Sequence, residues 1–206
     1  MASFHSKTLS KCDEWYTPAS AWEDLYEIIE FQQMLSGKKI WEAFPGDGRS
    51  ADNLRKMGWD VISDIPDFFE GQPDPKEWDL IISNPPFSKK KEVFTRLKKL
   101  GKPFIMICPA SMLTTKYIRE LFDLEPDEDP DDNTGLKIII PRKRIQFLKP
   151  DEDGNTTKPG RCNFDCFYYC WQLQFHANID ESTMRLPDLS WVDPQWHVKN
   201  HKRDYL

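Results

Sequence analysis

Five consecutive residues, Ser83-Asn84-Pro85-Pro86-Phe87, combine an amide side chain, two prolines and an aromatic ring. The apolar, β-branched run at 80–82 predicts a short strand before them, and the prolines end it because neither can donate a ladder hydrogen bond. Asn84 is therefore expected at the carboxyl end of a strand, where open α/β sheets bind ligands. Asn84 Oδ1 and the Pro85 carbonyl could accept both protons of an exocyclic amine on a flat base, with Phe87 stacked on its ring.

A second candidate site is a glycine turn between a predicted strand at 38–44 and a predicted helix at 49–57. Its sequence is Pro45-Gly46-Asp47-Gly48, and glycines at such a turn let the backbone approach a ligand closely. A dinucleotide fingerprint needs a third glycine, which is missing here. The turn therefore favours a cofactor with a neutral adenosine and a zwitterionic amino acid over a pyrophosphate.

The next predicted strand, 59–64, ends in an acid, Asp64. A carboxylate at the end of this strand can accept hydrogen bonds from both ribose hydroxyls, which is the usual logic of nucleoside sites. Ahead of the glycine turn, Thr17 is predicted to cap a helix running from Ala19 to Leu35, with Pro18 in its first turn.

In this order the motifs resemble those of S-adenosylmethionine-dependent methyltransferases that act on adenine N6 in DNA, in particular the bacteriophage-type group with Asn-Pro-Pro-Phe. Pro109-Ala110-Ser111 and Arg144-Ile145-x-Phe147 resemble the same group, although Pro45 stands where such families often have a small residue. The resemblance covers roughly Asp13 to Phe175. It implies S-adenosylmethionine as the cofactor, methyl transfer to N6 as the reaction, and no metal.

The resemblance also implies roles for individual residues. The catalytic set is Asn84, Pro85, Pro86 and Phe87. The cofactor set is Tyr16, Thr17, Pro18, Glu42, Ala43, Phe44, Gly46, Asp47, Gly48, Asp64, Asp67 and Phe68. Within it, Asp67 would accept from the adenine amino group and Phe68 would cover the adenine ring, although Phe68 and Phe69 could equally belong to the core.

Alternating strands and helices, ending in late strands with no long helix between them, predict an α/β doubly wound sheet. The resemblance refines this to a Rossmann-like class I methyltransferase fold, with seven mostly parallel strands of which the last is antiparallel. We expect one domain over residues 1–206, with a mobile lead-in at 1–12 and a C-terminal extension at 177–206 that wraps over the domain or contacts a partner.

Basic residues are concentrated beside the proposed catalytic turn, in a predicted helix over 88–102. We expect this helix and a later basic cluster to contact nucleic-acid phosphates, or else to form solvated faces. The residues predicted to do so are Lys89, Lys90, Lys91, Arg142, Lys143 and Arg144. An acidic loop at 123–132 is expected to be solvated, and the formal net charge of -6 counts mildly against nonspecific duplex binding.

Composition indicates the class of protein and the cellular compartment. The 206 residues are 39% hydrophobic and 30% charged, which is typical of a soluble globular domain, and neither a membrane-spanning run nor a signal pattern is evident. Five cysteines without a CxxC motif favour reduced thiols and a cytoplasmic location. Cys162, Cys166 and Cys170 alternate onto one face of a predicted strand at 163–175, which favours a core role over a zinc site.

Other functions remain open at this level. RNA adenine is an alternative substrate because the chemistry is shared, and a protein glutamine or small amine is another, although those enzymes more often carry Tyr in place of Phe87. A non-catalytic subunit that keeps the fold as a binding scaffold is a third. DNA is favoured over RNA, with a protein partner as one source of target specificity, and a phage or mobile-element origin fits the resemblance.

Overall fold

The computed structural model describes residues 15–27, 35–64, 67–122, 135–141, 143–149, 158–159, 164–173 and 189–192, with side chains omitted from the description at 158–159 and 189–192. Arg142, Cys162, the lead-in 1–12, the acidic loop 123–132 and most of the extension 177–206 lie outside these ranges. The predictions made for those segments stay predictions.

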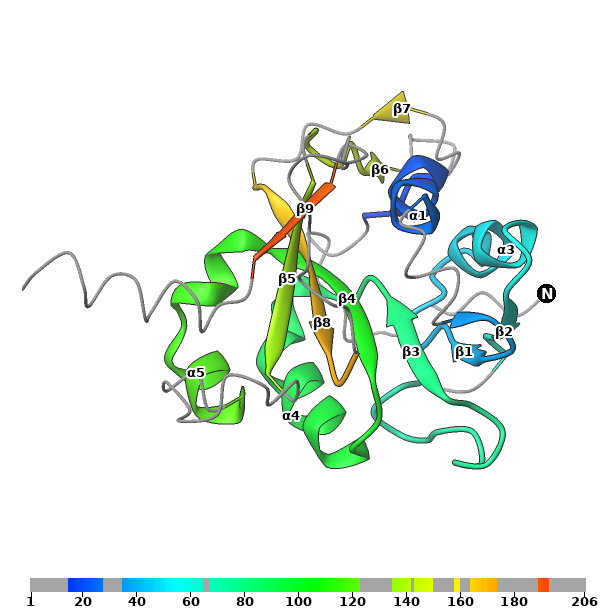
Figure 1. Ribbon diagram of the computed structural model, residues 1–206, viewed down its shortest axis with the longest axis horizontal. Helices are drawn as coiled ribbons and strands as arrows, with labels where there is room; N and C mark the ends of the chain where they lie inside the picture. Colours follow the sequence, from blue (N-terminus) through cyan, green and yellow to red (C-terminus); the bar gives the residue numbers. More distant parts are fainter. Residues whose placement is uncertain are drawn as a thin grey trace, which may run out of the picture.

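One mixed sheet forms the centre of the molecule. Its strands are β1 (Lys39–Trp41), β2 (Asp60–Ile62), β3 (Leu80–Ser83), β4 (Phe104–Pro109), β5 (Leu136–Pro141), β8 (Cys166–Trp171) and β9 (Leu189–Val192). They lie in the order β2-β1-β3-β4-β8-β5-β9 (Figure 1). The four strands from β2 to β4 are parallel, whereas β8 is antiparallel to both β4 and β5.

This arrangement fits the Rossmann-like expectation of a mostly parallel sheet with a late antiparallel strand. Six of its strands come from the range that the resemblance covers, and β9, which pairs with β5 at the edge, comes from beyond it. A seventh strand within that range is not found in this sheet among the described residues. The short β6 (Leu148–Lys149) and β7 (Lys158–Pro159) form a separate antiparallel pair.

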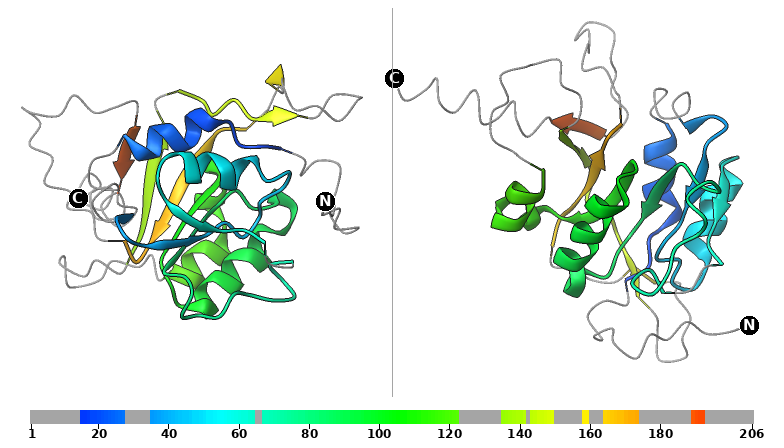
Figure 2. Two further views of the ribbon diagram at one scale, coloured as in Figure 1. Left: turned by 90° about the vertical axis from the view of Figure 1, so that its right-hand side faces the viewer. Right: turned by 90° about the horizontal axis from the view of Figure 1, so that it is seen from below.

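Helices cover both faces of the sheet, as a doubly wound fold requires. On one face α1 (Ala19–Tyr26) and α3 (Arg49–Lys56) pack against strand residues such as Ile82 and Ile105. On the other face α4 (Lys90–Leu100) and α5 (Lys116–Phe122) pack against Ile81 and Met106. Figure 2 shows the two helical layers on opposite sides of the strands. Because side chains alternate along a strand, neighbouring strand residues pack into two separate cores on opposite faces of the sheet.

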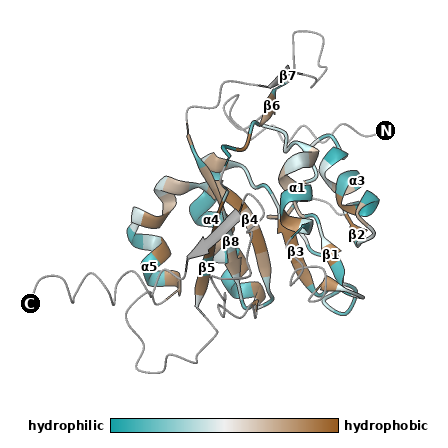
Figure 3. Cartoon of the chain, turned by 45° about the horizontal axis from the view of Figure 1, so that its top comes forward, coloured by the Kyte–Doolittle hydropathy of each residue, from teal (hydrophilic) through white to brown (hydrophobic). Residues whose placement is uncertain are grey.

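The local sequence explains the main elements. All six residues of β4 are buried, as expected for a central strand covered on both faces, and Figure 3 shows β3 and β4 in the hydrophobic colour. In α4, Val93, Phe94 and Leu97 form the buried stripe at helical spacing. Gly101 ends this helix in the left-handed conformation with φ of 66°. Among the described residues, no helix is both long and apolar enough to cross a membrane.

Two local predictions are wrong. Thr17 does not cap α1, because Pro18 occupies the N-cap position and no side chain makes a capping hydrogen bond there. The sequence also predicts that the apolar strand at 136–140, broken at Pro141, resumes at Ile145-Gln146-Phe147, and no strand forms there. Instead Ile145 and Phe147 are buried in the core beneath α1 and α3, and regular pairing begins only at Leu148 in β6. Burial in a core therefore explains their apolar character better than strand alternation does.

Candidate active site

The turn predicted to be catalytic, Asn84 to Phe87 (below, the catalytic turn), lies where the sequence predicted it, directly after β3. Pro85 and Pro86 are buried, and Pro86 leads into a short 3-10 turn, η1 (Phe87–Lys89), closed by a hydrogen bond from the Lys89 amide to the Pro86 carbonyl at 3.1 Å. The helix α4 follows without a break. The fixed φ angles of the two prolines hold Asn84 at the carboxyl edge of the parallel strands.

The side-chain amide of Asn84 is oriented by one hydrogen bond. Its Nδ2 donates to the Trp15 carbonyl at 3.2 Å. Its Oδ1 is buried and has no hydrogen-bond partner among the described residues. A buried acceptor without a donor costs about 1–3 kcal/mol, so such groups are rare and point to a missing partner.

Backbone pairing holds the segment that contains Trp15. Tyr16 and Leu148 exchange two backbone hydrogen bonds, of 2.9 and 2.8 Å. The Tyr16 ring then lies against Gly46, where a Cβ atom would stand 3.1 Å from Tyr16 Cε1. The guanidinium of Arg49 lies 5.8 Å from the centre of the same ring. The segment Trp15–Tyr16, called the opening segment below, therefore contacts both the catalytic turn and the glycine turn. These three parts together are called the corner.

The glycine turn has the backbone conformation for which glycine is needed. Gly46 and Gly48 have φ of 58° and 90°, a region that residues with a side chain rarely adopt. The Gly48 amide donates to the Pro45 carbonyl at 2.8 Å, and Gly48 is the N-cap residue of α3. The Asp47 carboxylate accepts from the Arg49 side chain at 2.6 and 2.7 Å, which leaves an ion pair at the exposed rim of the turn.

The buried carboxyl group of Glu42 is hydrogen-bonded to residues beside both turns. Glu42 is fully buried and accepts hydrogen bonds from Ser50 Oγ at 2.6 Å, from Ser83 Oγ, and from the Phe44 amide at 3.1 Å. Ser50 belongs to the first turn of α3, and Ser83 immediately precedes Asn84. Burial raises the pKa of Glu42 to about 7, although these hydrogen bonds pull it in the opposite direction. Glu42 therefore positions the two turns from inside the protein and offers no exposed oxygen to a ligand.

The two predicted cofactor acids differ in their surroundings. Asp64 is exposed just beyond the end of β2, where its carboxylate can reach a ligand. Asp67 is half-buried, and its Oδ1 accepts from the Phe69 amide at 2.9 Å. One oxygen of Asp67 thus already stabilises the backbone of its own loop.

The predicted role of Phe68 as a cover for the adenine ring is wrong. Phe68 is only 1% exposed, and its ring packs against Phe44 at 4.7 Å and Trp41 at 5.6 Å between centroids. The Arg96 guanidinium lies 5.2 Å from its ring centre. With its ring buried among these neighbours, Phe68 belongs to the core alternative. Phe44, which is half-buried at the end of the first strand segment, remains accessible.

Phe87 belongs to an aromatic cluster with Trp15, Phe147 and Phe164. Its ring meets Phe164 edge-on at 5.1 Å and Phe147 at 6.2 Å, and Trp15 meets Phe164 at 6.1 Å. Edge-to-face contacts of this kind fix ring orientation. The cluster places aromatic surface beside Asn84, from four separate parts of the chain.

The remaining predicted cofactor residues surround the same corner. Thr17 and Ala43 are buried, and Pro18 is half-buried.

Of the predicted nucleic-acid residues, Lys91 is exposed on α4, whereas Lys89 lies 5.1 Å from the Phe69 ring centre. Arg144 is paired with Asp165 at 2.6 Å, and this contact holds the pKa of Asp165 below its usual value. Lys143 is exposed, and Lys90 is half-buried.

Sequence reasoning missed Ser50, Ser83 and Phe164. A signal for Ser83 was present, because it is the polar residue of an otherwise apolar strand, and Glu42 is an acid among the apolar residues Ile40, Trp41, Ala43 and Phe44 of the neighbouring predicted strand. Two polar residues at the matching ends of adjacent buried strands predict a mutual hydrogen bond. In the part of the chain that is described, no group of three or more His, Cys, Asp or Glu residues could hold a metal ion.

No family model matches the chain, and no curated protein matches it. A solved structure described as "a putative methyltransferase from Thermoplasma acidophilum" is similar at 12% identity over 75% of this chain, with a TM-score of 0.35. The match spans 64% of that structure's own length. At this TM-score the likeness supports no statement about function.

Proposed function

We propose that this chain is an S-adenosylmethionine-dependent methyltransferase that acts on the exocyclic N6 amine of adenine in DNA. The observation that carries the proposal is the buried Asn84 Oδ1, which has no donor within the described residues. Because the Trp15 carbonyl fixes Nδ2, the oxygen is aimed at whatever enters the corner after β3. An amine with two hydrogens is a ligand that would satisfy it.

The chemistry follows from this acceptor. The lone pair of an aromatic amine is delocalised into the ring, which makes the amine a poor nucleophile. If Asn84 Oδ1 accepts a hydrogen bond from one N–H and the Pro85 carbonyl accepts one from the other, the lone pair is localised on nitrogen. The nitrogen would then take the methyl group as the bond from that methyl to the sulfonium sulfur breaks, which would leave a neutral thioether, and one amine proton would pass to solvent. Phe87, held edge-on by Phe164, would lie against the ring of the base. The residues thereby supply alignment and charge placement and need no covalent intermediate.

The residues around the glycine turn fit the proposed cofactor. Gly46 and Gly48 leave the backbone open to close approach, the Tyr16 ring walls one side, and the exposed Asp64 is placed to accept from ribose hydroxyls. Bound S-adenosylmethionine would supply a methyl group already activated on a sulfonium. Glu42 and Ser83 would keep the glycine turn and Asn84 at a fixed separation.

Incubation with labelled cofactor and a panel of duplex DNA, single-stranded DNA, RNA and protein, followed by nucleoside analysis, tests the proposal. We expect N6-methyladenine in DNA. Label that appears only in RNA adenine, or only in a protein amide or small amine, would assign the same corner to a different substrate. Cofactor binding by calorimetry without transfer to any substrate would favour a different reaction, and no cofactor binding at all would favour a non-catalytic scaffold.

A further inference from the structure

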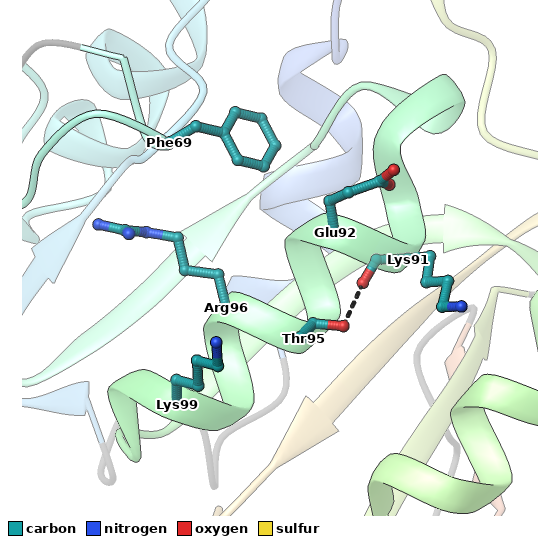
Figure 4. A pocket seen from close by; sticks show the side chains of 6 residues that line it. All are labelled: Phe69, Lys91, Glu92, Thr95, Arg96 and Lys99. Carbon is teal, nitrogen blue, oxygen red and sulfur yellow. Dashed lines mark hydrogen bonds between the residues drawn. The ribbon is translucent and has the colours of Figure 1, made fainter.

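The structure contains a cavity on the outer side of α4, apart from the corner described above. Its volume is about 410 Å³, and it is lined by Phe69 and by five residues of the helix, of which Lys91 extends away from Phe69 (Figure 4). The helix residues that line it are Lys91, Glu92, Thr95, Arg96 and Lys99. None of them belongs to the catalytic turn or to the glycine turn. Three cations against one acid give this cavity a positive lining in a chain whose net charge is -6.

Several cations of this helix region are already engaged with the protein. Lys98 lies 4.7 Å from the ring centre of Trp171, and Lys102 donates to backbone carbonyls and covers Trp78 at 4.1 Å. By contrast, Lys91 and Lys99 are exposed, and no side-chain hydrogen bond or ion pair to either is found within the described residues. Residue type alone does not distinguish the lysines that are engaged from those that are not.

Arg96 lies between Lys91 and Lys99 in the sequence of α4, and contacts with the protein hold its side chain in place. Its guanidinium donates to the Gly71 carbonyl at 3.0 Å and lies over Phe68, while its Nε is buried without a hydrogen-bond partner among the described residues. This anchoring ties the loop of Phe69 to the helix, so the ring is held over the cavity (Figure 4). The cavity therefore combines a rigid cation, a fixed aromatic ring and two unengaged lysines.

The spacing of the two lysines matches a polynucleotide. Lys91 and Lys99 are eight residues apart in α4, slightly more than two turns, so their Cα atoms are about 12 Å apart along the helix axis at about 1.5 Å per residue and about 80° apart around it. Successive nucleotides of a stacked duplex strand rise about 3.4 Å each, and an extended single strand spaces its phosphates further apart, so the two lysines would contact different phosphates of one strand. Phosphates placed along that row would also bring a base against Phe69, as in sites that bind single strands by stacking.

We propose that this cavity binds the backbone of a single-stranded nucleic acid, with Lys91 and Lys99 on phosphates and Phe69 against an unstacked base. The inference rests on the proposed function, because it names where the polynucleotide substrate runs beyond the target adenine. The proposed ligand is a strand without secondary structure, because a base inside a duplex has no free face that could stack on Phe69.

The test uses a labelled twelve-residue oligothymidylate, which contains no adenine and so reports on this cavity independently of methyl transfer. Fluorescence anisotropy of the full chain at several salt concentrations should give binding that weakens as salt rises. The double variant Lys91→Ala/Lys99→Ala should reduce the salt slope by about 1.4 and the affinity at 0.1 M salt by about 25-fold, the factor expected for two single-strand contacts of about 0.7 each. The control Lys38→Ala/Lys56→Ala removes the same charge from exposed positions outside α4 and should change neither.

A second arm isolates the aromatic contact. Phe69→Ala should weaken oligothymidylate binding by between about 5-fold and about 150-fold, with an unchanged salt slope, and should leave binding of inorganic polyphosphate unchanged. Equal binding by the double lysine variant and the unaltered chain, or no binding of oligothymidylate at all, would overturn the inference even if adenine is methylated. Oligothymidylate binding with the expected losses but without methyl transfer would instead overturn the proposed function alone.

Discussion

Asn84 and Trp15 lie far apart in the sequence, and the Trp15 carbonyl accepts the hydrogen bond from Asn84 Nδ2 at 3.2 Å. This contact decides which end of the amide faces the corner. It leaves the oxygen without a hydrogen-bond partner among the described residues, which is the property that the proposed chemistry needs. The same contact brings the opening segment and the catalytic turn into one site.

Replacing Asn84 should separate binding from chemistry. Asn84→Ala removes the acceptor, and Asn84→Asp replaces the donor facing the Trp15 carbonyl with an oxygen that repels it. Both variants should lower methyl transfer by about 100-fold or more, a loss typical of removing one preorganised transition-state contact. Cofactor affinity, measured by calorimetry, should stay near that of the unaltered chain. Loss of cofactor affinity in both variants would show that Asn84 has been assigned the wrong role.

Gly46→Ala should disturb the cofactor site through Tyr16. The new Cβ would lie 3.1 Å from Tyr16 Cε1, in a backbone with φ of 58°. Gly58→Ala is the matched control, because Gly58 also has a positive φ, of 90°, but has open space around it. Both variants should lose about 1–2 kcal/mol of unfolding free energy from backbone strain, whereas only Gly46→Ala should weaken cofactor binding. Equal cofactor affinity in the two variants would contradict the placement of Tyr16 at the site.

Glu42 should make stability depend on pH. The carboxyl titrates near 4.5 in the unfolded chain and near 7 in the folded one, so between these values the folded state holds more protons. The free energy of unfolding should therefore fall as pH rises from 4.5 to 7, by on the order of 3 kcal/mol. Below pH 4.5 the stabilisation is fully present, and above pH 7 it is lost.

Glu42→Gln checks this pH dependence. The amide keeps an acceptor for Ser83 and the Phe44 amide, and the Ser50 hydroxyl can rotate to accept from the new NH₂. Urea unfolding of both proteins across this pH range should show the fall for the unaltered chain and a flatter line for the variant. Parallel lines would mean that Glu42 does not titrate in this window.

Asp64→Asn should weaken cofactor binding before it affects folding. The side chain is exposed, so the substitution leaves the core unchanged. Loss of a charged acceptor for two hydroxyls should reduce cofactor affinity by between about 10-fold and about 100-fold. Asp60→Asn, at an exposed position of the same strand, serves as the control and should bind normally. A similar affinity for both variants would remove Asp64 from the site.

The catalytic and glycine turns could be predicted because proline and glycine act on the chain locally. Pro85 and Pro86 must end a strand, and Gly46 and Gly48 permit the turn into α3 wherever the surrounding sheet lies. Their meeting at one sheet edge followed from the alternation of strands and helices. Local chemistry and simple topology were sufficient for these features.

Contacts between distant segments could not be predicted in the same way. Phe68 resembles a ligand-covering ring in sequence, but its burial depends on Trp41 and Arg96, whose positions the fold alone decides. The pairing of Tyr16 with Leu148 is made by backbone atoms, which leave no trace in side-chain pattern. The sorting of the α4 lysines into engaged and unengaged groups likewise depends on neighbours from other elements.

The backbone pairing of Tyr16 with Leu148 implies an unusual tolerance at position 148. The amide and carbonyl of that residue hold the opening segment, and every amino acid except proline supplies both. Natural variation or a saturation library at 148 should therefore leave the amide of Asn84 correctly aimed in almost every case. Proline alone would remove one of the two hydrogen bonds, the one that the amide of residue 148 donates to the Tyr16 carbonyl. The sequence of a distant relative could therefore differ at this position without changing the contact between the two segments.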